Sequence, residues 1–219
     1  MGKTNLRLLS KDEINKVLVI LSNIYTDARC GLEYSNALEL TVALILAAQC
    51  TDKRVNMILP ILFEKYPNID SLSSAKQKDV EEIIHSCGFY NNKAKNIILT
   101  SKIIKNKYNG IVPDTMEDLT SLAGIGRKSA NIILQECFGK TVGIAVDTHV
   151  RRISKRLGLT NSTDPIKIEQ DLMGILPGRY WNKINHILVC HGRTICNARK
   201  PKCEICPVNM LCKNTGGSL

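Results

Sequence analysis

Two glycines separated by one residue, Gly124 and Gly126, stand between two stretches that each have the apolar periodicity of a helix. The pair predicts a tight hairpin, because glycine readily adopts positive φ and allows close backbone approach. Amide groups at the start of the second helix, with the positive end of its dipole, suit a phosphate. Gly124, Ile125 and Gly126 are therefore candidate contacts to a nucleic-acid backbone, although a plain helix–helix corner would have the same pattern.

Lys128 lies in the first turn of that second helix, which we expect over residues 127–137. Cations are disfavoured at this end of a helix, and helical side chains lean back toward the N-terminus. The amine would therefore project toward whatever the hairpin binds. The helix N-terminus and the adjacent Arg127 both favour the neutral amine that a Schiff-base nucleophile requires. The alternative is a solvated lysine that binds a phosphate.

Asp147 precedes an amphipathic segment that ends at Gly158. A carboxylate at this position predicts an N-cap, and a capping carboxylate is both ionised and rigidly held. Such a group could also stabilise a developing cation or relay a proton.

The charge of the chain indicates a polyanionic partner. The formal net charge is +10, and the basic residues are spread along the chain rather than collected in one tail. No apolar run approaches transmembrane length, and the first residues lack the apolar core of a signal peptide. We therefore expect a cytoplasmic protein.

Four of the nine cysteines lie close together near the C-terminus, at Cys196, Cys203, Cys206 and Cys212. They predict a four-thiolate metal site, because an odd total and no export signal argue against a disulfide framework. Structural zinc usually uses two C-x2-C pairs and only one is present, while ferredoxin spacings do not match either. The spacing alone leaves zinc and an iron–sulfur cluster open. The other five cysteines are interpreted as small buried side chains.

The remaining sequence predicts further helices, and the fold class is all-α. Ser10 and Glu13 form a capping box, and a buried central helix is expected over residues 38–48. A helix capped by Thr51 is expected to be kinked or broken near Pro60. We find no convincing run of alternating strand residues and no internal repeat.

Six features occur in order along the chain: LAAQCTD (46–52), GFYNNKAKNI (88–97), LAGIGRKSANIIL (122–134), VDTHVRR (146–152), HGRTIC (191–196) and the terminal cysteines. Together they resemble the helix-hairpin-helix DNA glycosylases, specifically the endonuclease III branch. Their joint order is specific and spans nearly the whole chain.

The resemblance implies a two-lobed fold with a C-terminal loop in which the four cysteines hold a 4Fe–4S cluster. A helical-barrel domain that contains the hairpin would span residues 30–138. Residues 1–29 and 139–219 would form a discontinuous iron–sulfur domain. Lys128 would be the nucleophile and Asp147 its catalytic partner, and the two would face each other across the interlobe cleft.

A glycosylase must take its target base out of the stack, and something must fill the gap. In the family a glutamine and an apolar residue do this, and the matching positions are Gln49 and Phe89. Core packing is the alternative for Phe89 and for Tyr90. Asp52 and His149 are expected near the substrate pocket, although His149 would equally suit a helix surface.

The implied function is a bifunctional DNA glycosylase and AP lyase that acts as a monomer on double-stranded DNA. It would excise oxidised pyrimidines through a Schiff base on Lys128 and cleave the strand 3′ to the abasic site by β-elimination. Arg199, Lys200 and Lys202, within the cysteine loop, would contact phosphates.

Three other functions are weighed against this one. Adenine-excising relatives lack the lysine and carry a glutamate in the buried helix before the glutamine, which argues against adenine excision. The alternatives that stay open are a mismatch-specific thymine glycosylase on the same fold and a non-enzymatic iron–sulfur DNA-binding sensor.

Overall fold

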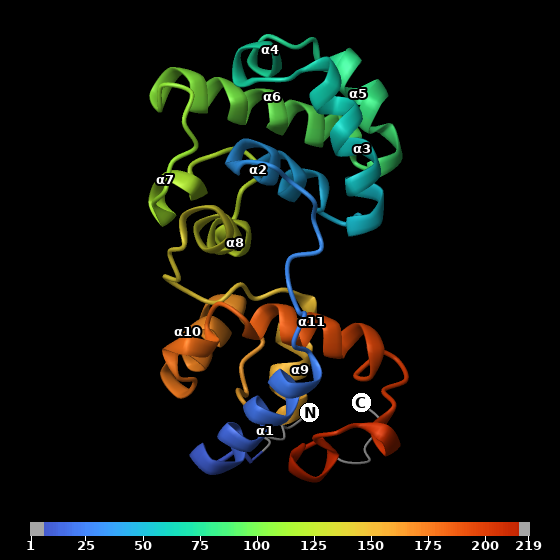
Figure 1. Ribbon diagram of the computed structural model, residues 1–219, viewed down its shortest axis with the longest axis vertical. Helices are drawn as coiled ribbons and strands as arrows, with labels where there is room; N and C mark the ends of the chain where they lie inside the picture. Colours follow the sequence, from blue (N-terminus) through green and yellow to red (C-terminus); the bar gives the residue numbers. More distant parts are fainter. Residues whose placement is uncertain (1–6, 215–219) are drawn as a thin grey trace. The chain divides into compact units, whose positions relative to one another are not determined.

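The computed structural model describes residues 7–214, and no β-strand occurs within them (Figure 1). The all-α prediction is confirmed. The chain forms two compact units. The first, Cys30–Val142, is called the hairpin unit here, and the second, the cysteine-loop unit, is built from the described residues before and after it. No helix in residues 7–214 has both the length and the apolar character needed to cross a membrane.

The hairpin unit surrounds one buried helix, α2 (Ala37–Leu46). Its residues 40–46 are all buried, and α3, α6 and α8 all contact it. A helix covered on several sides has no need of a polar face, which explains why this segment is apolar nearly all round. The other elements are α3 (Asp52–Lys65), α4 (Ile69–Ser73), α5 (Gln77–Ile84), η1 (His85–Cys87), α6 (Tyr90–Lys107), α7 (Met116–Thr120) and α8 (Arg127–Phe138).

Helix α3 continues through Pro60, so of the two expectations there the break is wrong and the kink stays a prediction. Proline removes one backbone hydrogen bond from a helix interior. Pro60 lies on the exposed side of α3, while Val55, Leu59 and Leu62 are buried on the other side. These apolar contacts hold both halves of the helix against the core and offset the lost bond.

The cysteine-loop unit joins segments from the two ends of the described chain. The first helix, α1 (Lys11–Ile24), begins with the predicted capping box of Ser10 and Glu13, which is confirmed. Its buried side chains pack in one core with those of α9, α10 and α11. The elements after the hairpin unit are α9 (Thr148–Leu157), α10 (Pro165–Ile175), η2 (Gly178–Tyr180), α11 (Ile184–Thr194), η3 (Cys203–Ile205) and η4 (Asn209–Leu211).

Candidate active site and nucleic-acid interface

The predicted hairpin connects α7 to α8, and its two glycines serve different purposes. Gly124 has φ +79°, and a Cβ there would lie 2.9 Å from Nδ2 of Asn96, so this position requires glycine. Gly126 is extended, with φ −98°, and caps α8. A Cβ at Gly126 would meet nothing within 4 Å. The prediction of positive φ is therefore confirmed at Gly124, whereas Gly126 leaves open space at the start of the helix.

Ile125 anchors the hairpin. Its side chain is buried, and its N–H donates to the carbonyl of Leu122 at 3.2 Å. The hydroxyl of Thr100, on α6, donates to the carbonyl of Ala123 at 2.8 Å and ties the turn to the next helix. The first intrahelical bond of α8 runs from Ala130 N to Gly126 O, so the amides of the first turn point out of the helix end. Contact with a phosphate at this end stays a prediction.

Lys128 is exposed in the first turn of α8, as predicted. Cys30 lies near it: burial raises the pKa of the Cys30 thiol, the carboxylates of Glu136 and Asp52 raise it further, and the Lys128 ammonium lowers it. Asp52 begins α3, and its Oδ2 would lie 2.7 Å from a Cβ at Gly31. The hairpin unit thus gathers Lys128, Asp52 and Cys30 in one region.

Cys30 was not among the predicted site residues, because the five scattered cysteines were interpreted as buried side chains. Only Cys87 is buried; Cys30, Cys50, Cys137 and Cys190 are half-buried. Nothing in the sequence around Cys30 signals its neighbours, since they come from distant segments.

Gln49 and Phe89 both occupy strained backbone positions. Their φ angles are +54° and +48°, in the left-handed region that only glycine enters without cost. Gln49 lies in the turn between α2 and α3, and Phe89 follows Gly88 at the start of α6. Both side chains are exposed, and 64% of Phe89 is accessible. Strain of this kind persists where a function requires it, so these two turns are candidates for contact with a ligand.

Tyr90 differs from its neighbour Phe89. Its ring packs against that of His85 at an interplanar angle of 38°, with the ring centroids 4.4 Å apart, and the side chain is half-buried. Packing accounts for Tyr90, whereas Phe89 has no comparable burial.

Asp147 is the N-cap of α9, and its Oδ1 accepts a hydrogen bond from Val150 N at 2.8 Å. The predicted cap is confirmed. His149, in the first turn of the same helix, is half-buried, and its Nδ1 lies 3.2 Å from Nη2 of Arg152. Lys128 belongs to the hairpin unit and Asp147 to the cysteine-loop unit.

Helix α9 also holds the cysteine loop. Arg152 Nη2 donates to the carbonyl of Cys196 at 3.0 Å, and Arg156 donates to the carbonyls of Asn197 and Ala198 at 2.7 and 2.8 Å. The sequence analysis did not single out these arginines. Their spacing of four residues, which places them on one face of a helix, was the available signal.

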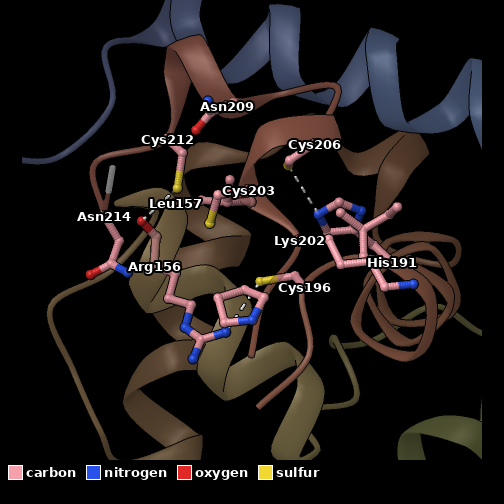
Figure 2. A pocket seen from close by; sticks show the side chains of 12 residues that line it. Arg156, Leu157, His191, Cys196, Lys202, Cys203, Cys206, Asn209, Cys212 and Asn214 are labelled. Atoms are coloured by element: carbon pink, nitrogen blue, oxygen red, sulfur yellow. Dashed lines mark hydrogen bonds between the residues drawn. The ribbon is translucent and has the colours of Figure 1, made fainter. Parts of the chain in front are cut away.

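All four predicted cysteine ligands line one pocket, together with Arg156 and His191 (Figure 2). Arg156 Nη1 lies 3.4 Å from Sγ of Cys196 and donates to it. Burial raises the pKa of the thiols of Cys206 and Cys212. Within residues 7–214, no three His, Cys, Asp or Glu side chains converge closely enough to hold a single metal ion.

His191 lies between α1 and the cysteine pocket. The Tyr25 hydroxyl is 3.0 Å from its Nδ1, and Cys206 Sγ is 3.8 Å from its Nε2. Burial lowers the pKa of His191 to about 4, so the ring is neutral near pH 7.

Three cations are exposed on the loop that begins at Cys196. They are Arg199, Lys200 and Lys202. The backbone of Lys202 is fixed, because its N–H donates to the carbonyl of Ile195 at 2.9 Å. The loop therefore presents a cluster of positive charge on a tethered backbone.

Residues 42–178 match the HhH-GPD superfamily of base excision DNA repair proteins, the class that this helical fold and its hairpin define. The endonuclease III of Synechocystis sp. is 45% identical over 208 residues, which cover 95% of each chain. The chain belongs to the endonuclease III family.

Several solved structures share the fold, and two of them are compared with this chain. One is an endonuclease III trapped as a covalent intermediate with DNA, with TM-score 0.90 and 39% identity over 95% of this chain and 98% of that one. The other is a thermostable thymine-DNA glycosylase, with TM-score 0.81 and 24% identity over 94% and 97%. At that identity the second likeness concerns the fold alone.

Proposed function

We propose that this protein is a bifunctional DNA glycosylase and AP lyase of base excision repair. The observation that carries the proposal is Lys128, an exposed amine in the first turn after the hairpin. The chain is 39% identical to an endonuclease III that was captured in covalent linkage to DNA. The substrate is double-stranded DNA that contains an oxidised pyrimidine or an abasic site, and the protein acts in the cytoplasm as a monomer.

The reaction begins when the neutral amine of Lys128 attacks C1′ of the damaged nucleotide. The glycosidic bond breaks, and its electron pair leaves with the base. Asp147 takes the proton that the nitrogen loses after the C–N bond has formed, or stabilises the cationic sugar, as a rigidly held carboxylate can. The nitrogen lone pair then forms the second C1′–N bond while the C1′–O4′ bond breaks; O4′ keeps that electron pair and takes up a proton, and the ring-opened sugar is bound as an iminium.

The iminium acidifies C2′, so a base removes a proton there and the C3′–O3′ bond breaks. The phosphate leaves with that electron pair, which cuts the strand 3′ to the lesion. Water then hydrolyses the imine and restores Lys128. A single lysine thus accounts for both activities.

The duplex is opened by Gln49 and Phe89, whose exposed side chains fill the gap that the extruded base leaves. The amides at the hairpin and the cations Lys200 and Lys202 contact phosphates. Asp52 and His149 border the base pocket.

Cys196, Cys203, Cys206 and Cys212 hold a 4Fe–4S cluster in this proposal, as the resemblance implies. The residues around them suit thiolate ligands, because Arg156 donates to one sulfur and Nε2 of His191 faces another. When bound, the cluster supplies a cross-link that fixes the basic loop. Protein purified without oxygen should contain about four irons per chain. Stoichiometric zinc without iron would overturn this assignment.

Borohydride trapping on thymine-glycol duplex tests the nucleophile. Wild type should give a covalent adduct, and Lys128→Gln should give none while still binding the DNA. The matched control is Lys16→Gln, which removes an exposed lysine of α1 and should trap normally. Adducts at the wild-type level with Lys128→Gln would mean that another amine is the nucleophile.

Two further substrates separate the alternatives. Excision from G·T duplexes but not from thymine glycol would identify a mismatch thymine glycosylase. Tight binding of damaged DNA with no adduct on any substrate would identify a non-enzymatic sensor.

A further inference from the structure

Lys93, on α6, is a buried lysine that the proposed mechanism does not use. It is 4% exposed, and burial lowers the pKa of its ammonium group. Burying an ammonium is costly unless each hydrogen finds a partner. Nζ donates to the carbonyl of Leu46 at 2.8 Å and to the carbonyl of Cys87 at 2.9 Å. An apolar side chain would fill this space at lower cost, so the charge itself requires an explanation.

Both carbonyl partners lie at the ends of helical segments. Leu46 is the last residue of α2, and Cys87 is the last residue of η1. Carbonyl groups at a helix C-terminus lack intrahelical partners and carry partial negative charge. One ammonium group therefore caps two helix ends that are 41 residues apart in the sequence.

The two capped ends lead directly into the two strained turns. Gln49, with φ +54°, comes three residues after Leu46, and Phe89, with φ +48°, comes two residues after Cys87. Among the described residues, only Asn109 is a further non-glycine with positive φ. Lys93 is thus bonded to the base of each turn that carries an exposed, strained side chain.

We propose that Lys93 is a positioning residue that fixes the Gln49 turn and the Phe89 turn relative to each other. The two side chains then meet the duplex as one preformed unit, and ordering them requires no binding energy. The inference builds on the proposed function, in which these side chains open the duplex. Lys93 itself touches no substrate, because its amine is enclosed by the protein and engaged by two carbonyls.

The test compares Lys93→Met, which keeps the length of the side chain without donors, with Lys93→Gln, which keeps a donor. Lys93→Met should slow base excision from a thymine-glycol duplex roughly 10- to 100-fold, as a displaced positioning group does. Cleavage at a pre-formed abasic site, which costs less to extrude, should change less. Lys93→Gln should recover part of the loss. Equal losses on both substrates would overturn the proposal.

The matched control is Ser101→Ala, on the same helix. Its hydroxyl is fully buried and donates to the carbonyl of Ile97 at 2.8 Å, away from both turns. This variant loses a buried hydrogen bond and should treat the two substrates as wild type does. A selective loss on duplex in Ser101→Ala would mean that general destabilisation produces the effect, and would overturn the positioning role.

A mutant cycle separates positioning from folding. In a Gln49→Ala/Phe89→Ala background, adding Lys93→Met should cost little further excision, because the side chains that it positions are gone. A full additional loss would overturn the proposal. Fluorescence of 2-aminopurine beside the lesion reports unstacking without any chemistry. If wild type forms no covalent adduct, the proposed function fails, while a smaller 2-aminopurine signal in Lys93→Met would still support the positioning role.

Discussion

Replacing Phe89 with glycine and with alanine separates the backbone strain at this position from the function of its side chain. A left-handed conformation costs an L-residue about 1–2 kcal/mol, and Phe89 has φ +48° and ψ +29°. Glycine avoids that cost but adds about 0.5–1 kcal/mol of unfolded-chain entropy relative to alanine. Phe89→Gly should therefore be more stable than Phe89→Ala by roughly 0.5–1 kcal/mol.

The assay is urea unfolding followed by far-UV circular dichroism, with excision measured on the same preparations. Lys102, exposed within α6, supplies the control, because Lys102→Gly should be less stable than Lys102→Ala by a similar amount. Both Phe89 variants should slow excision from duplex, since neither retains the ring. If Phe89→Gly is less stable than Phe89→Ala, the backbone at this position is unstrained and the reasoning is refuted.

Three further predictions concern charged groups. Changing Lys200 and Lys202 together to alanine should weaken DNA binding and flatten its salt dependence by about one to two units, and an unchanged slope in a salt titration would remove the loop from the interface. Asp147→Asn keeps a capping side chain and should slow excision by roughly 10², with a smaller effect at abasic sites in single-turnover assays. The hydrogen bond from Lys213 and that from the Ser10 backbone lower the pKa of Glu13 from 4.5 to about 2. Its stabilisation is therefore complete above pH 4.5 and lost toward pH 2, so Glu13→Gln should lower the urea midpoint at pH 7 but match wild type near pH 2.

Local rules for helix capping predicted several helix starts correctly. The helix caps at Ser10, Thr51 and Asp147 follow from side chains that bond to amides three residues ahead, and all three are present. The expected break at Pro60 is absent, because the cost of a proline within a helix depends on which side of the helix it faces. Tertiary packing determines that side, and the sequence does not show it.

The strained turns and the buried ammonium group could not be predicted from the sequence. Positive φ at Gln49 and Phe89 contradicts their residue types, and it persists because tertiary contacts fix both turns. Lys93 stands in a helix where any lysine suggests a solvated position, and its two acceptors come from other segments. The same limit applies to Cys30, whose thiol pKa is shifted by Glu136, Asp52 and Lys128 from distant segments.

The division of the chain into units has a consequence for how the protein is made. Helix α1 leaves the ribosome early, yet its buried residues Val17, Leu18 and Leu21 pack with helices that follow Val142. More than a hundred residues must be translated in between, which takes on the order of ten seconds at bacterial rates of synthesis. The hairpin unit is continuous in sequence and can fold during that interval. The apolar face of α1 stays exposed to solvent until the later helices have been synthesised. A nascent chain paused within the hairpin unit therefore exposes the apolar face of α1, which makes it prone to aggregation.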